Sequence, residues 1–453
     1  MMNYTTTTNG AITNSTSGKE CLDLFQRIGN MRYEDRLRIL EEFQTAFKDD
    51  KELATQILFW ARAARIGSGE RKTFHTILSE IGKTSPDFIS DNATTIAELG
   101  YWKDLVPYLH IDNVVSVFAQ AIRDKDRLAC KWAPRKCAVI RDELNMTNKE
   151  YRKWLKKHSE TVEQKMSEKS WSDINYSSVP GSAMRRYSGA FTTQDSKRFD
   201  EWKDDKTSKA SVSATYPHEV LKCDDSKLAD KLWSDLPNFL SESEENILPM
   251  IDTSGSMMGE PLAIAISLGM YLAERSKGEF NDMFLSFSER PELIKIKGDS
   301  VQNRLSNISR AEWGMNTDFE KAYMHILRLA KKHNVVKDSM PTMLLVLSDM
   351  QFDESQGGWG GNMPHFNHMK EEYEKAGYDL PKIVFWNLDA HMGTPAQCSD
   401  DSVAMVSGFS PSIMKAILNA EEFTPKDVMK EALKDIELNY INLPEDFSYV
   451  LES

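Results

Sequence analysis

The chain has 453 residues, of which 40% are hydrophobic and 28% are charged, and its formal net charge is −13. This composition is typical of a globular protein with a large core and excludes an intrinsically disordered or low-complexity chain. No run approaches the ~18 consecutive apolar residues that span a bilayer, and the first 20 residues lack a secretory signal pattern. The five cysteines are scattered without a CxxC pair. We therefore expect a soluble, cytoplasmic protein in a reducing compartment, with no membrane contact.

The charge divides unevenly along the chain. Residues 1–240 hold 37 basic and 35 acidic side chains, whereas residues 241–453 hold 19 basic and 34 acidic ones. The largest local excess of Lys and Arg lies in residues 131–171. Because an acidic surface repels RNA, any nucleic-acid contact is expected on the first part of the chain.

The first part of the chain has a helical pattern. Residues 1–18 are rich in Thr, Asn, Ser and Gly and predict a flexible arm. From residue 19 to residue 240, apolar side chains recur every three or four positions, which predicts successive amphipathic helices. Helices that follow one another without strands are typical of an α-helical, HEAT-like repeat domain, although no sequence period is visible.

Residues 241–453 have a different pattern, in which short apolar runs predict strands and amphipathic stretches between them predict helices. The apolar runs are residues 247–251, 283–287, 293–296, 343–347, 383–388 and 403–406. Such alternation indicates an α/β domain with a mostly parallel, Rossmann-like sheet. In sheets of this kind, ligands bind at the carboxyl ends of the strands.

Oxygen-bearing side chains stand at those strand ends. Asp252 and two serines follow the first predicted strand, and Asp349 follows the run 343–347. Carboxylate and hydroxyl oxygens are the hard ligands that suit Mg²⁺ or Mn²⁺. Taken alone, the first motif leaves open a simpler interpretation, in which Asp252 and Ser254 only cap the helix that follows.

Three motifs together resemble the metal-ion-dependent adhesion site of von Willebrand factor A domains. They are DTSGS at 252–256, NTD at 316–318 and SD at 348–349, in that order along the chain. The resemblance implies that two serines and a threonine ligate the ion directly and that two aspartates hold it partly through water. It also implies an open coordination position for an acidic group of a partner protein. The implied metal residues are Asp252, Ser254, Ser256, Thr317 and Asp349.

The first part of the chain also carries a resemblance. The segments WARAARIGSGERKTFHTIL (60–78), KWAPRK (131–136) and WSDINYSSVPGSAMRRYSGAF (171–191) resemble a family of uncharacterised phage, bacterial and plant proteins. Its members fuse a helical half to a von Willebrand factor A domain. The layout is similar to that of the Ro autoantigen (TROVE) proteins, whose helical-repeat ring binds structured or misfolded RNA. The resemblance implies RNA or a ribonucleoprotein as partner.

Basic residues beside the predicted loops are the candidate RNA contacts, and Trp60, Trp132 and Tyr187 are available for stacking. For each of these basic residues, a solvated helix face is the alternative interpretation. The candidates are Arg62, Arg65, Arg71, Lys72, Lys131, Arg135, Lys136, Arg185 and Arg186.

Enzyme motifs fit poorly. Residues 67–73 approximate a P-loop, but Arg71 replaces the glycine that precedes the lysine. Ser254 stands where a phosphoaspartate enzyme needs its second carboxylate, and His365 and His368 lack a third zinc ligand. We therefore expect a non-enzymatic protein without a small-molecule substrate. Mg²⁺-assisted phosphoryl chemistry stays open as the enzymatic alternative.

Overall fold

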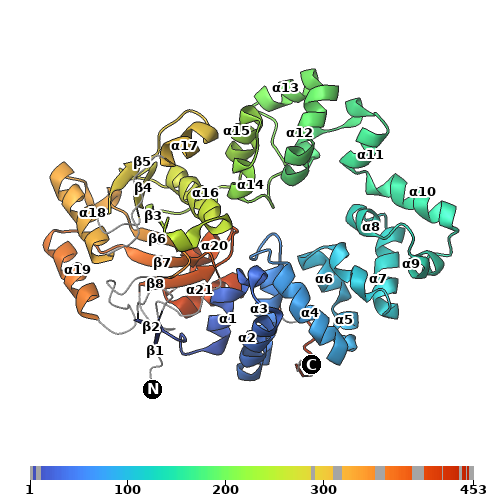
Figure 1. Cartoon of the computed structure of the whole chain (residues 1–453), viewed down its shortest axis with the longest axis horizontal. Helices are drawn as coiled ribbons and strands as arrows, with labels where there is room; N and C mark the ends of the chain where they lie inside the picture. Colours follow the sequence, from blue (N-terminus) through green and yellow to red (C-terminus); the bar gives the residue numbers. More distant parts are fainter. Residues whose placement is uncertain are drawn as a thin grey trace. The chain divides into compact units, whose positions relative to one another are not determined.

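The computed structural model describes residues 4–6, 12–286, 291–309, 319–351, 363–389, 402–420, 422–437, 441–444 and 446–447. The chain forms two compact units (Figure 1). The α/β unit consists of residues 1–34 and 212–434, and the helical unit consists of residues 35–211 and 435–453.

The α/β unit contains a two-stranded and a six-stranded sheet with helices. Its elements are β1 (Tyr4–Thr6), β2 (Ile12–Asn14), α1 (Glu20–Ile28), η1 (Met31–Tyr33), α14 (Pro217–Leu221), α15 (Ser226–Ser234), β3 (Ile247–Ile251), η5 (Gly255–Met257), α16 (Glu260–Arg275), β4 (Met283–Ser286), β5 (Leu293–Lys295), α17 (Val301–Ile308), α18 (Phe319–His333), η6 (Lys337–Ser339), β6 (Met343–Ser348), α19 (Met363–Lys375), β7 (Lys382–Asn387), β8 (Val403–Ser407), α20 (Ile413–Asn419) and α21 (Pro425–Leu433).

The large sheet has the strand order β5-β4-β3-β6-β7-β8. Only β5 is antiparallel to its neighbour, and the other pairings are parallel. The central strands β3, β6 and β7 and the terminal strand β8 are mostly apolar and buried, which is the pattern of parallel strands covered on both faces. Register places Ile251 opposite Leu347, so the residues after β3 and β6 meet at one edge.

Helices cover both faces of this sheet. On one face, side chains of α18 and α19, including Tyr323 and Tyr373, join Met250 and Val346 in a buried cluster. On the other face, α16 contacts β3, β4 and β6 (Figure 1). Gly269 of α16 approaches the sheet so closely that an added Cβ would lie 2.5 Å from Ile251. The unit is therefore a three-layer α/β/α structure.

The N-terminal helix α1 belongs to the α/β unit, where it contacts β8 and α21. The Ser407 hydroxyl donates a hydrogen bond to the Phe25 carbonyl at 3.1 Å. The Asn30 side chain donates to the carbonyl of Asn387, the last residue of β7, at 2.5 Å. Residues 19–34 are thus attached to the sheet, whereas the sequence pattern assigned them to the helical domain.

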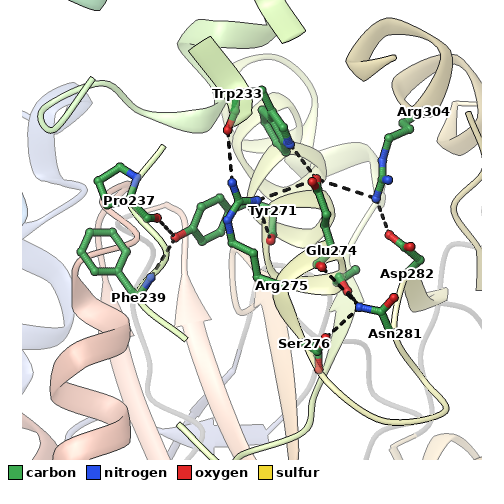
Figure 2. Close-up of polar contacts among 11 residues, drawn as sticks. Trp233, Pro237, Phe239, Tyr271, Glu274, Arg275, Ser276, Asn281, Asp282 and Arg304 are labelled. Carbon is green, nitrogen blue, oxygen red and sulfur yellow. Dashed lines mark hydrogen bonds and ion pairs between the residues drawn. The ribbon is translucent and has the colours of Figure 1, made fainter. Parts of the chain in front are cut away.

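Residues 233–239 are attached to α16, a helix that covers the sheet, through the polar network drawn in Figure 2. The Trp233 indole N–H of α15 donates to the Glu274 carboxylate of α16 at 2.6 Å, and the Trp233 carbonyl accepts from Arg275 at 3.1 Å. The Arg275 guanidinium lies 4.1 Å from the centre of the Tyr271 ring, and the Tyr271 hydroxyl donates to the Pro237 carbonyl. These contacts explain why the observed units divide at residue 212, whereas the sequence pattern placed the boundary at residue 240.

The helical unit consists of short helices. They are α2 (Arg36–Asp49), α3 (Lys51–Arg62), α4 (Lys72–Thr84), α5 (Pro86–Asp91), α6 (Ala93–Leu99), η2 (Trp102–Tyr108), α7 (Asp112–Arg123), α8 (Arg127–Trp132), α9 (Ala138–Glu143), α10 (Asn148–Ser159), α11 (Val162–Ser167), η3 (Trp171–Asp173), η4 (Tyr176–Ser178), α12 (Gly181–Gln194) and α13 (Ser196–Asp204). Side-chain caps begin several of them: Asp35, Asp50 and Asp126 each accept a backbone N–H, and Thr147 forms a capping box with Glu150.

The predicted fold class, a helical N-terminal part followed by a mostly parallel α/β domain, is confirmed. Within the predicted arm, β1 pairs with β2. Helix α17 and the pairing of β5 carried no signal in the sequence pattern. Across the described residues, every helix is too short or too polar to cross a membrane.

Candidate metal site and candidate nucleic-acid surface

The candidate metal site is built on residues 252–257, here named the serine loop, which connects β3 to α16. Asp252 is 1% exposed, and its Oδ1 accepts a hydrogen bond from the Ser254 N–H at 2.9 Å. The hydroxyl oxygens of Ser254 and Ser256 lie 3.0 Å apart, with Ser254 buried and Ser256 exposed. The loop therefore places a buried carboxylate beside two hydroxyls, of which that of Ser256 is exposed.

The neighbouring strand β6 supplies the second half of the site. The Ser348 hydroxyl donates to Asp252 Oδ2 at 2.5 Å, and the Asp252 N–H donates to the Leu347 carbonyl at 3.0 Å. Asp349 is fully buried, and its Oδ1 accepts from the Gln351 N–H at 3.0 Å. Parallel pairing of β3 with β6 thus brings together the two aspartates that the sequence motifs selected. Ser348, which was not in the predicted set, is the residue that connects them.

The electrostatics of this edge favour a bound cation. Burial, followed by the charge of Asp349, raises the pKa of Asp252 from 3.8 to about 6, against the opposing hydrogen bonds of Ser348 and Ser254. Two close, buried carboxylates destabilise each other when both are ionised. The Thr253 hydroxyl oxygen is also buried and has no hydrogen-bond partner among the described residues. Hard oxygen donors of this kind fit Mg²⁺ or Mn²⁺.

Two predicted features lie outside the described part of the chain. Thr317, with the rest of residues 314–318, is among them, so its place relative to Asp252 is not described. The side chain of His365 is likewise outside it. His368 is half exposed and lies 3.8 Å from Glu320. In the described residues, no three His, Cys, Asp or Glu side chains gather as a metal cluster.

The candidate RNA contacts lie in the helical unit and differ in exposure. Arg65, Arg71, Lys72, Arg135, Lys136 and Arg186 are exposed, Lys131 and Arg185 are half buried, and Arg62 is buried. Six of the nine cations can therefore meet a phosphate without rearrangement.

Arg62 does not fit the expected RNA contact, because it is only 2% exposed. Its Nε donates to the Asp104 carboxylate at 2.7 Å, and a second guanidinium nitrogen lies 2.6 Å from the same oxygen. His75 Nε2 lies 2.9 Å from the other carboxylate oxygen of Asp104. The Tyr101 N–H donates at 3.0 Å to the oxygen that Arg62 contacts. Burial opposes ionisation of Asp104, but His75, Arg62 and the Tyr101 amide together hold its pKa below the ordinary value. Arg62 is thus an interior structural cation.

The GSG turn before α4 is also structural. An added Cβ on Gly67 would lie 1.9 Å from the Trp60 carbonyl oxygen, so only glycine fits there. Glu70 is 1% exposed, and its Oε1 accepts the N–H groups of Lys72 and Thr73 at 2.9 and 3.2 Å. This carboxylate occupies the helix N-terminus, where a phosphate would bind in a P-loop. Trp60 is 1% exposed, so it does not offer the stacking surface expected from the sequence.

Two further predicted stacking residues are half buried: Tyr187, whose hydroxyl donates to Glu163 at 3.2 Å, and Trp132, which lies at the end of α8. The ammonium groups of Lys103 and Lys131 lie 5.2 and 5.4 Å from the centre of its ring. Arg135 and Lys136 follow directly in the next turn. The sequence did not indicate that Lys103, which belongs to η2, lies beside Trp132.

Two family models match the chain, one on each side of residues 238–245. The model described as "Domain of unknown function (DUF2828)" matches residues 7–119 and 113–237, and "Domain of unknown function (DUF7788)" matches residues 246–442. The "Uncharacterized protein L728" of Acanthamoeba polyphaga mimivirus is 26% identical over 512 residues, which cover 97% of this chain and 89% of that protein. The crystal structure of the Deinococcus radiodurans Ro (RSR) protein is similar with a TM-score of 0.36 and 13% identity, over 92% of this chain and 93% of that one.

Proposed function

The chain belongs to the family described as "Domain of unknown function (DUF2828)", and we propose that it is a non-enzymatic binding protein with two binding surfaces. The α/β unit holds a divalent cation, Mg²⁺ or Mn²⁺, at the carboxyl edge of its sheet. The helical unit binds RNA or a ribonucleoprotein. This is the two-part layout that the sequence motifs led us to expect.

One observation carries the metal proposal: Asp252 is buried beside Asp349 and is hydrogen-bonded to two serines from adjacent parallel strand ends. A divalent cation would neutralise this pair of carboxylates and accept the hydroxyl oxygens of the serine loop as ligands. The residues that would hold it are Asp252, Ser254, Ser256, Thr317 and Asp349. When bound, the ion supplies an open coordination position for an anionic group.

The test of the metal proposal is a Mg²⁺ titration of the full chain. Calorimetry measures binding, and thermal denaturation measures the melting temperature at each Mg²⁺ concentration. We expect Mg²⁺ to bind and to raise the melting temperature, because a ligand that binds only the folded state stabilises it. Asp252→Ala and Ser256→Ala abolish both effects. Ser309→Ala, at an exposed serine after α17, is the matched control and leaves both effects unchanged. A wild-type chain that neither binds nor is stabilised by Mg²⁺ would refute the proposal.

The RNA proposal is supported by the exposed cations of the helical unit and by the aromatic ring of Trp132 beside them. Phosphate contacts from Lys and Arg make affinity fall with salt, by about 0.7 to 0.9 in log–log slope for each neutralised phosphate. We therefore expect salt-dependent RNA binding by the full chain in a mobility-shift assay. The double variant Arg135→Ala/Lys136→Ala reduces the slope.

Lys156→Ala is the matched control for that experiment. Lys156 forms an ion pair with Glu168 at 2.5 Å on a solvated face, so its loss leaves RNA affinity unchanged. RNA binding that is absent, or that does not depend on salt, contradicts the RNA proposal and leaves the metal proposal standing.

The second candidate function is capture of an acidic residue of a partner protein at the metal. It is favoured by the exposure of Ser256 and of Met258, whose side chain is 72% exposed at the end of the same loop. The exposed Met258 side chain offers such a partner an adaptable apolar contact beside the ion. In this case the partner is retained in Mg²⁺, released by EDTA and lost in Asp252→Ala. Retention in EDTA counts against it.

A further inference from the structure

The C-terminal residues of the helical unit run along its helices as a segment without helix or strand in its described part, 435–437, 441–444 and 446–447. Three apolar side chains of this segment are buried: Ile436, Ile441 and Phe447 are 1%, 6% and 2% exposed. The chain reaches this segment directly from α21 of the α/β unit. We name the described residues 435–437, 441–444 and 446–447 the C-terminal strap.

Asn92, between α5 and α6, holds the strap by its backbone. Its Oδ1 accepts the Asn442 N–H at 2.9 Å, and its Nδ2 donates to the Asn442 carbonyl at 2.8 Å. One amide side chain therefore satisfies both backbone groups of a single residue, as a neighbouring strand would. Asn92 itself is fully buried and is fixed by a further bond from Nδ2 to the Phe88 carbonyl at 2.8 Å.

Two more amide side chains contact the strap at its ends. Gln56 of α3 donates to the Ile436 carbonyl at 2.8 Å, and Gln44 of α2 donates to the Phe447 carbonyl at 3.3 Å. All these bonds go to main-chain atoms of the strap. Contacts of this kind recognise an extended backbone and leave the side chains at those positions free to vary.

Specificity comes from the buried side chains. The Phe447 ring meets Phe43 edge-on with its centre 4.8 Å away, and Phe47 lies 6.0 Å away on the same helix. Burial of an aromatic ring between two others is typical of the anchor residue of a peptide ligand. Main-chain bonds for affinity and side-chain pockets for specificity are together the features of a peptide-binding groove.

We propose that α2, α3 and the α5–α6 junction form a groove for extended peptides, that the C-terminal strap is its intramolecular ligand, and that an extended segment of a partner protein replaces it. The partner segment carries two aliphatic side chains and an aromatic one at the spacing of Ile436, Ile441 and Phe447, with a residue other than proline opposite Asn92. Proline is excluded because it lacks the N–H that Asn92 accepts. The inference is independent of metal and RNA binding.

The strap can leave the groove at limited cost to the rest of the unit. Between described residues, the side chains of Gln44, Gln56 and Asn92 make the hydrogen bonds that join the strap to the groove, and loss of these bonds breaks no backbone bond within α2, α3 or α6. Segments with few contacts of their own and no regular structure open at lower free energy than the core that holds them. Tethering to α21 gives the strap an effective concentration on the order of millimolar, so a free peptide competes poorly until the strap is weakened.

The experiment weakens the strap within the full chain and adds it back as a peptide. The probe is a fluorescein-labelled peptide of residues 435–453, and its affinity is measured by anisotropy. We expect Phe447→Ala to bind this peptide at least ~10-fold more tightly than the wild-type chain does, because its intramolecular competitor has lost the anchor. A peptide that itself carries Phe447→Ala binds at least ~10-fold more weakly than the unmodified one. Thr45→Ala, at an exposed position of α2, is the matched control and behaves as the wild type.

Adding Asn92→Ala to the Phe447→Ala chain removes the backbone clamp and lowers affinity for the unmodified peptide. A folded Phe447→Ala chain that binds the peptide no better than the wild type would overturn the proposal. If Phe447→Ala does not fold, Gln44→Ala/Gln56→Ala takes its place, since it removes two hydrogen bonds to the strap and keeps every buried ring. The same gain in peptide affinity is expected, and its absence again refutes the groove.

Discussion

Replacing Arg62 by methionine tests whether this residue stabilises the fold through its buried ion pair with Asp104 rather than binding RNA. Arg62→Met keeps most of the side-chain volume but leaves the buried carboxylate of Asp104 with His75, the Tyr101 N–H and the more distant Arg71 guanidinium, 3.8 Å away, as partners. Breaking a buried ion pair from one side costs about 3 to 5 kcal/mol, because the remaining charge is uncompensated. Three partners of Asp104 remain, so we expect the lower end, about 3 kcal/mol, in urea denaturation at pH 7.

The pH dependence has a definite sign. Because the folded pKa of Asp104 lies below its ordinary value, the carboxylate contributes stability above about pH 4, and this contribution is lost as the pH falls through the folded pKa. Arg62→Met removes part of the cause of that low pKa. The difference in the free energy of unfolding between the wild type and Arg62→Met therefore becomes smaller as the pH falls. Adding Asp104→Asn to Arg62→Met removes the orphaned charge, and the double variant is expected to be more stable than the sum of the single effects predicts.

Arg65→Met is the matched control, since Arg65 is exposed three residues further along. It is expected to change stability by less than about 0.5 kcal/mol, as surface substitutions generally do. A cost below about 1 kcal/mol for Arg62→Met, or a double variant as unstable as the sum of both single changes, would refute the reasoning about the buried pair.

Three further predictions concern single contacts. In EDTA, Asp252→Asn is expected to be more stable than wild type at pH 7 by up to about 3 kcal/mol, because the raised pKa of about 6 makes the metal-free domain lose stability as pH rises from 4 to 6. The gain vanishes at pH 4 in denaturation curves, and a loss at pH 7 would contradict the prediction. Glu70→Ala removes the acceptor at the start of α4 and costs about 1 to 2 kcal/mol, whereas Glu70→Gln, which keeps an oxygen, costs less in the same melts. Trp233→Phe removes the 2.6 Å bond to Glu274 and lowers stability by about 1 to 3 kcal/mol in urea denaturation, and an unchanged midpoint would show that the bond is unimportant.

Strands β3, β4, β6, β7 and β8 could be predicted from sequence because each coincides with a short, mostly apolar run between polar segments. The carboxyl edge followed from them: once β3 and β6 are parallel neighbours, Asp252 and Asp349 must come close. Ser348 belongs to the SD motif but was not among the implied ligands, and only the structure shows that its hydroxyl points to Asp252. Arg62 was misjudged for a related reason, since a basic residue near a loop has the same sequence pattern whether it faces solvent or a buried carboxylate.

The predicted boundary at residue 240 lies between the two family-model matches, but the compact units of the structure divide elsewhere, and periodicity could not predict that division. Helices α1, α14 and α15 have the same amphipathic pattern as those of the helical unit, and nothing local indicates which surface each one covers. Their assignment depends on contacts between distant residues, such as Asn30 with Asn387 and Trp233 with Glu274. The contact between the C-terminal strap and Asn92 could not be predicted for the same reason, because residues 350 positions apart share no sequence pattern.

The distribution of charge assigns the two proposed ligands to different units. Residues 241–453 carry 34 acidic and 19 basic side chains, and two of the carboxylates are buried together at the carboxyl edge of the sheet. Such a surface attracts Mg²⁺ and repels a polyanion, so RNA binding at this edge would work against the field of the whole unit. The helical unit lacks this excess of acid, and the exposed cations around Trp132 lie there. A variant such as Asp252→Ala should therefore abolish metal binding without reducing RNA affinity, and a parallel loss of both would mean that one surface serves both ligands.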